Sequence, residues 1–138
     1  MATEAKTRPT TEESLQQIGA DTYSGILEMV TELREANEDQ SSARADAARQ
    51  TIDEDPLSVE VRCGWYSPGA AEEHRDPEEF CILLGTGGPA TRIIGTLLHG
   101  EAESARLQAQ DWGTPWTDYR GADEAVLLDY ARCFWFGE

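Results

Sequence analysis

Basic residues are scarce in this 138-residue sequence, where eleven lysines and arginines stand against twenty-seven acidic residues for a formal net charge of −16. A chain this negative repels nucleic acid, anionic membranes and phosphate-rich substrates, and it favours a basic partner. The imbalance is shared along the chain: residues 1–55 hold thirteen acids and five bases, and residues 56–138 hold fourteen acids and six bases. Charge therefore excludes classes of ligand without defining the fold.

Long apolar runs are also missing. No stretch approaches the roughly 20 apolar residues of a membrane span, and residues 1–14 lack the apolar core of a secretory signal. The cysteines, Cys63, Cys81 and Cys133, are odd in number and form no CxxC pair. This usage is typical of reduced, buried thiols in the cytoplasm. The sequence predicts a cytoplasmic protein with no membrane segment.

Residue patterns that carry catalysis or bind metal are absent as well. The two histidines, His74 and His99, lie far apart, and neither has a second ligand at metal-site spacing. Cys133 has no histidine near it in sequence to act as a base. The only glycine-rich run, Gly85–Pro89, lacks the lysine and the following helix of a phosphate-binding loop, so it indicates a tight turn. We expect no enzyme activity, no catalytic residues, no cofactor and no metal.

Apolar residues make up 39% of the chain and include four tryptophans, which indicates a folded domain rather than a disordered acidic tail. We divide this single domain into a flexible tail (1–10), a helical segment (11–55) and an α+β core (56–138). Apolar residues recur at helical spacing from Leu15 to Leu33, and residues 37–42 are a plausible break. The helical segment is therefore either a hairpin of two helices or one long interrupted helix.

Beyond Pro56 the apolar period changes to two. Val59, Val61, Cys63 and Trp65 alternate with polar residues and glycine, which predicts a strand with one buried face. Residues 80–84 are apolar on both faces and predict a central strand covered on both sides. Residues 90–98 and 105–110 predict two further strands, and residues 123–137 a closing helix. Short loops favour an antiparallel meander, so the expected fold class is α+β: N-terminal helical segments, a four-stranded antiparallel β-meander and a C-terminal helix.

The densest run of charge lies between residues 72 and 79, in an expected inter-strand loop. It holds five acidic residues: Glu72, Glu73, Asp76, Glu78 and Glu79. Three interpretations stay open: a solvated loop, a docking surface for Arg and Lys of a partner, and a divalent-cation site. The alternating ligands and supporting glycine of an EF-hand loop are missing, so we favour the first two.

A second candidate patch combines aromatic and acidic side chains. Asp111, Trp112, Trp116 and Asp118 occur within eight positions, beside Tyr119. Tryptophan and tyrosine are frequent in interface hot spots, and they also seal the ends of small sheets. The patch is therefore either core packing or a partner contact, in which the acids would pair with Arg or Lys and the aromatics would exclude water.

Four stretches, 55–65, 84–89, 105–119 and 127–138, together resemble a family of small acidic proteins carried by phages, prophages and mobile elements of proteobacteria. The resemblance brings no catalytic residues. It implies an antagonist of host defence, acting in the host cytoplasm as an anti-CRISPR or anti-restriction protein that mimics DNA.

These observations lead to one principal hypothesis and one alternative. The first is a non-catalytic inhibitor that binds a basic, nucleic-acid-binding surface of a host defence complex through the two acidic patches. It would bind neither nucleic acid nor membrane itself. The alternative is an assembly module of a mobile element that forms a homodimer through its N-terminal helices, with acidity serving solubility only.

Overall fold

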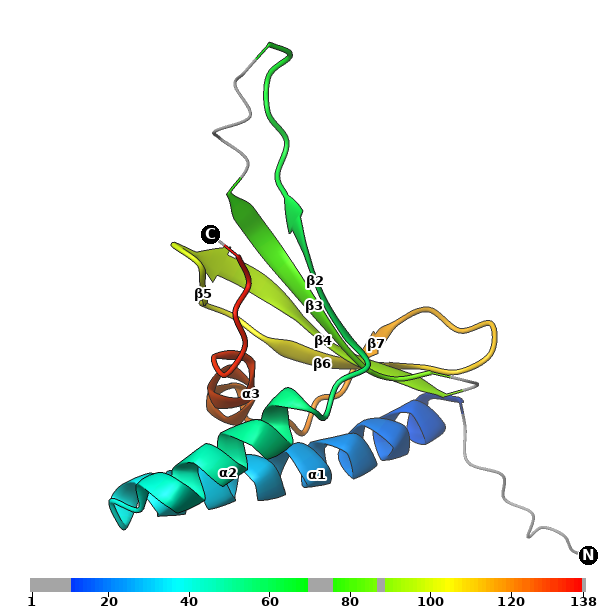
Figure 1. Cartoon of the computed structure of the whole chain (residues 1–138). Coiled ribbons are helices and arrows are strands. Elements are labelled where there is room, and N and C mark those ends of the chain that lie inside the picture. The colour runs from blue at the N-terminus through cyan, green and yellow to red at the C-terminus, as the bar shows by residue number, and fades with distance from the viewer. Residues whose placement is uncertain (1–10, 70–75, 87–88, 138) are drawn as a thin grey trace, which may run out of the picture.

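Three helices cover one face of an antiparallel sheet in the computed structural model, which describes residues 11–69, 76–86 and 89–137 (Figure 1). The elements, in chain order, are α1 (Thr11–Glu38), α2 (Ser42–Asp53), β2 (Ser58–Cys63), β3 (Pro77–Gly85), β4 (Ala90–Leu98), β5 (Glu101–Ala102), β6 (Arg106–Gln110), β7 (Thr117–Asp118) and α3 (Glu124–Ala131). This is the expected α+β class. Within the described part of the chain, no helix has the length and apolar character to cross a membrane.

The N-terminal helical segment forms a hairpin of two helices. α1 continues through Gly19 and Gly25 and ends at Glu38. α2 then begins after Ser41, whose side chain accepts a hydrogen bond from the backbone N–H of Arg44 and caps the helix. Leu15, Ile26, Val30 and other buried residues of α1 face the sheet and α3. The helices are therefore part of the same core as the sheet, and residues 1–10 lie outside the described residues.

The sheet has the strand order β2-β3-β4-β6-β7, and β5 pairs with β4 beside this path. All pairings are antiparallel. The four predicted strands are present, but β5 and β7 were missed because each has only two residues and shows no measurable period. β3 also begins at Pro77, so Glu78 and Glu79 belong to a strand and not, as predicted, to a loop.

The prediction that residues 80–84 are covered on both faces is wrong. Phe80 and Ile82 are buried under the helices, whereas Cys81 and Leu83 face the other side of the sheet and are partly exposed. The helices cover one face only (Figure 1). Cys81 and Leu83 are apolar, so the sequence predicted that their face of the strand is buried, yet that face is open to solvent.

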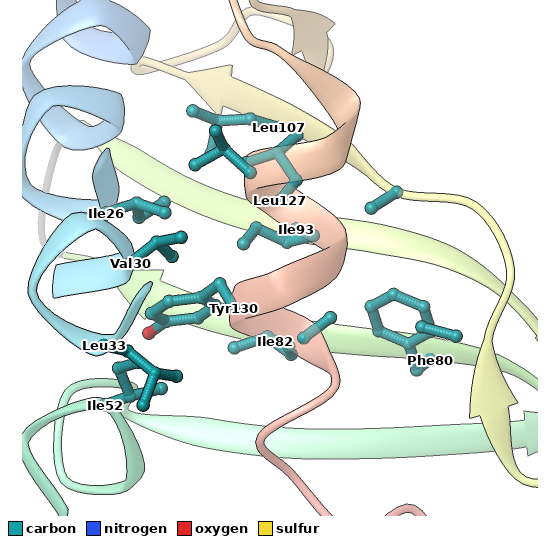
Figure 2. Close-up of a cluster of buried hydrophobic side chains, with 14 of the residues drawn as sticks. Ile26, Val30, Leu33, Ile52, Phe80, Ile82, Ile93, Leu107, Leu127 and Tyr130 are labelled. Atoms are coloured by element: carbon teal, nitrogen blue, oxygen red, sulfur yellow. The ribbon is translucent and has the colours of Figure 1, made fainter. Parts of the chain in front are cut away.

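The predicted buried face of β2 is also exposed. Val59 and Val61 keep 37% and 42% of their surface, Cys63 is exposed, and Trp65 is fully exposed at 103%. β2 is the edge strand of the sheet, and the core side chains shown in Figure 2 are packed over β3, β4 and β6. The alternating pattern correctly predicted a strand, but no described residue of the chain covers its apolar face as the pattern implied.

α3 closes the core, and it is shorter than predicted. It is capped by Asp123, ends at Ala131, and leaves Phe134 and Trp135 in the segment that follows. In that segment Phe136 packs on Phe80 with ring centroids 4.8 Å apart. Tyr130 lies at the centre of the core, between α1 and β3 (Figure 2).

Candidate functional site

The face of the sheet turned away from the helices, here called the open face, carries charged side chains in opposite-sign pairs. Arg62 on β2 forms an ion pair with Glu79, its direct cross-strand neighbour on β3. Arg106 on β6 lies 3.3 Å from Asp118 on β7. Exposed pairs of this kind contribute little to stability. Their consequence here is electrostatic, because each acid is neutralised by a neighbouring arginine.

A hydrogen-bonded chain links the other strands of the open face. Arg92 on β4 donates from Nε to Oε1 of Gln108 at 2.9 Å, and Gln108 donates from Nε2 to Oδ1 of Asp118 at 2.9 Å. The guanidinium of Arg92 also lies 4.1 Å from the centroid of the Trp116 ring, a cation–π contact. The side chains of Trp116 and Asp118 are thereby held against the sheet.

A broad depression of about 700 Å³ lies on the open face across β2, β3, β4 and β6. Its charged lining residues are Glu60, Arg62, Glu79, Arg92 and Arg106. Cys81 also lines it, and burial raises the pKa of this thiol, an effect that Arg92 opposes only in part. A thiol with a raised pKa stays protonated at neutral pH and is a poor nucleophile. The depression therefore lacks an activated group for covalent catalysis at Cys81.

The predicted acidic loop is only partly described. Glu72 and Glu73 lie outside the described residues, and Asp76 is exposed just before β3. Glu78 is exposed with its side chain against the backbone of Gly64, and Glu79 is committed to Arg62. Of the described acids in this run, Asp76 and Glu78 are therefore better placed than Glu79 to meet a partner.

The second predicted patch has two parts: one is exposed at a turn, and the other interacts with side chains of the open face. Trp112 is 83% exposed at a turn in which Asp111 accepts a hydrogen bond from the backbone N–H of Trp112. Trp116 and Asp118 instead take part in the network of the open face. Core packing thus does not describe Trp112, and it describes Trp116 only in part.

Among the described residues, the two predicted patches share the open face through Glu79 of the first patch and Trp116 and Asp118 of the second. The register places Asp118 level with Leu83, three strands across and four residues along from Glu79. Strand spacing and rise put the two carboxylates roughly 20 Å apart. With an arginine beside each, they do not form one continuous acidic surface.

The sequence reasoning missed a row of acids on α1. Its exposed members are Asp21, Glu28, Glu32 and Glu35, at intervals of seven, four and three residues. These intervals place the four carboxylates along one side of the helix, away from the buried side of Ile26. We call this row the α1 acidic stripe. It could have been found in sequence by reading the polar positions of the helix with the same period as the apolar ones.

Arg44 of α2 engages one end of the stripe. It lies 3.0 Å from Glu32 and 2.8 Å from Asp39. This contact lowers the pKa of the Glu32 carboxyl, chiefly through the hydrogen bond from Arg44, so Glu32 stays ionised at neutral pH.

Charge is therefore distributed unevenly between the two sides of the molecule. Residues 11–55, which form the helical hairpin and its connection to the sheet, contain twelve acids and three arginines. The open face carries three arginines beside Glu60, Glu79 and Asp118. Among the described residues, no group of three or more His, Cys, Asp or Glu side chains could hold a metal ion.

Comparison with known proteins adds no relative: no family model, no curated protein and no solved structure matches this chain. The resemblance to small acidic phage proteins stays a prediction. What the protein binds must be argued from its own surface.

Proposed function

We propose that the protein is a non-catalytic inhibitor whose acidic helical side occupies a basic, nucleic-acid-binding surface of a partner. The observation that carries the proposal is the α1 acidic stripe on the side of the molecule opposite the charge-balanced open face. Surfaces that bind nucleic acid are lined with Arg and Lys and release counterions when a polyanion binds. The resemblance seen in sequence would make that partner a host defence complex, such as a CRISPR effector.

The spacing of the stripe limits the kind of mimicry. Asp21 and Glu35 are separated by fourteen residues of helix, or about 21 Å. Double-stranded DNA carries one charge per about 1.7 Å of axis. The stripe is much sparser, so it fits a discrete cluster of Arg and Lys side chains rather than the whole length of a nucleic-acid channel.

Self-association through the N-terminal helices remains the alternative. The apolar sides of α1 and α2 already pack inside this chain, through residues such as Ile26, Ala45 and Ile52. A second copy would meet mainly the acidic sides of the helices, which repel one another. The same surface is favourable for a basic partner, and we therefore prefer the inhibitor hypothesis.

Reversing charge on the stripe tests the proposal. The triple variant Asp21→Lys, Glu28→Lys, Glu35→Lys leaves the Glu32–Arg44 pair intact. We expect at least a tenfold loss of affinity for a nucleic-acid-binding complex captured from the native host, or about 1.4 kcal/mol. Affinity of the wild type should fall between about 50 and 200 mM salt. Binding is measured by titration, and inhibition by the stoichiometry at which the complex loses its DNA or RNA.

The matched control carries the same change in net charge elsewhere. Asp76→Lys, Glu78→Lys, Asp111→Lys alters the exposed Asp76 and Glu78 and the partly exposed Asp111 of the two patches predicted from sequence. If this variant loses affinity and the stripe variant does not, those patches are the docking surface and the stripe is not. Inhibition at trace stoichiometry, with turnover, would reject a non-catalytic mechanism altogether.

A further inference from the structure

The edge strand β2 carries a row of apolar side chains that the described part of the chain leaves partly exposed. Val59 pairs with Ile82, and Val61 pairs with Phe80, across the β2–β3 ladder. Direct cross-strand neighbours share a face, so the valines extend the buried row of the sheet outward. They are nevertheless 37% and 42% exposed, and the neighbouring Leu57 is 60% exposed. The outer edge of β2 is the end of the strand order among the described residues (Figure 1).

We propose that β2 pairs antiparallel with β2 of a second copy of this chain, about a two-fold axis at Val61. Exposed edge strands are templates for pairing with another strand. In this register Val61 lies opposite Val61 of the second copy, and Val59 lies opposite Cys63 of the second copy. The apolar row then continues across the axis. The inference goes beyond the proposed function, because it involves neither the α1 acidic stripe nor a basic partner.

The charges of β2 select this register. Glu60 and Arg62 lie on the open face, and the two-fold at Val61 places Glu60 opposite Arg62 of the second copy. Arg62 is already beside Glu79, so the signs would alternate across the joined strands. An axis at Glu60 would instead oppose two glutamates, and an axis at Arg62 would oppose two arginines. Like charges directly opposite destabilise a strand pair, and opposite charges stabilise it.

The net charge predicts how the dimer responds to salt. Two copies with a net charge of −16 each repel at long range. Salt screens that repulsion, so self-association should strengthen as salt rises. Docking of the acidic stripe on a basic partner should weaken under the same change. β2 has six residues, which gives an interface below the standard size of about 1,600 Å², so we expect a weak dimer seen at high protein concentration.

A cysteine placed at Val59 reports the register. In the Val61-centred pair, the cysteine of the variant Val59→Cys lies opposite Cys63 of the second copy, and the two-fold axis produces this pair twice. The Cα atoms of directly opposite residues are close enough for a disulfide. Oxidised glutathione, as the electron acceptor, should convert the variant to a covalent dimer. Leu57→Cys is the matched control, because it faces Cys63 of the second copy only in the Glu60-centred register. Cross-linking of Leu57→Cys in preference to Val59→Cys would overturn the proposed register.

Charge exchange tests the pairing without any covalent bond. Glu60→Lys and Arg62→Glu should each lose self-association, because each homodimer then opposes like charges. Mixed in equal amounts they should form a heterodimer, because every opposed pair is again of opposite sign. Analytical ultracentrifugation at low and high salt measures all three samples beside wild type. A wild type that stays monomeric at every salt and concentration overturns the proposal. Affinity for a basic partner should be unchanged in both variants, so failure here is distinct from failure of the proposed function.

Discussion

Gly95→Ala should strongly destabilise the native state. Gly95 lies in β4 opposite Phe80, and a Cβ atom there would fall on the carbonyl oxygen of Ser104 and 2.8 Å from the Phe80 ring. Ser104 cannot withdraw, because its hydroxyl accepts from the N–H of Thr96 at 3.0 Å. Overpacking of a core costs about 1–3 kcal/mol. Here backbone must move, so we expect a loss of about 3 kcal/mol or more, which is a large part of a typical stability of 5–15 kcal/mol.

Gly25→Ala is the matched control for this substitution. Gly25 is exposed on α1, and a Cβ atom there would meet nothing within 4 Å. Alanine is favoured over glycine in a helix by up to about 1 kcal/mol, so this variant should be slightly more stable than wild type. Urea unfolding followed by tryptophan fluorescence measures both variants. Similar midpoints for Gly95→Ala and wild type would show that the β4–β5 region adapts to the extra carbon.

The sequence predicted the helices and strands more accurately than it predicted which of their faces are buried. Helical spacing from Leu15 to Leu33 and the alternation from Val59 to Cys63 each matched a real element. The spacing of apolar residues shows which side of a helix or strand is apolar. It does not show whether another helix or strand packs against that side. β2 is the clearest example, because its apolar side is an edge that the helices of this chain leave partly exposed. β7 had no period to read, and it was found only through its pairing with β6.

The candidate site was less predictable than the fold, for a related reason. Residues 72–79 were identified because acidic residues are dense there in the sequence. That density does not show which acids form ion pairs with arginines in the folded chain. Glu79 and Asp118 both lie beside arginines from other strands. The acids of α1 are spaced far apart in sequence but share one side of a helix. A helical period applied to charge, as well as to apolar residues, would have placed them together.

Tyr130→Phe should lower the free energy of unfolding at neutral pH by about 1.5 kcal/mol. The Tyr130 side chain is fully buried, and its hydroxyl donates to Oδ2 of Asp55 at 2.6 Å. A hydrogen bond to a charged group contributes about 1.5–3 kcal/mol. We take the lower end because Asp55 is exposed and water can replace the lost donor. Tyr130→Phe keeps the ring contacts, so the difference isolates the bond that joins α3 to the end of the helical hairpin.

The contribution of Tyr130 should disappear at alkaline pH. Burial first, and then the hydrogen bond to Asp55, raise the pKa of Tyr130 well above its ordinary value. In the unfolded chain this phenol ionises near pH 10, whereas in the folded protein it stays protonated. The stabilisation is therefore complete below pH 10 and is lost as the pH rises above 10, at about 1.4 kcal/mol per pH unit. Wild type and Tyr130→Phe should become equally stable about one pH unit above 10, and near pH 12 the variant should be the more stable. Burial also raises the pKa of the Cys81 and Cys133 thiols, but both proteins share these groups, so they cancel in the comparison. A difference in unfolding free energy that stays constant from pH 8 to 12 would contradict a buried, protonated Tyr130.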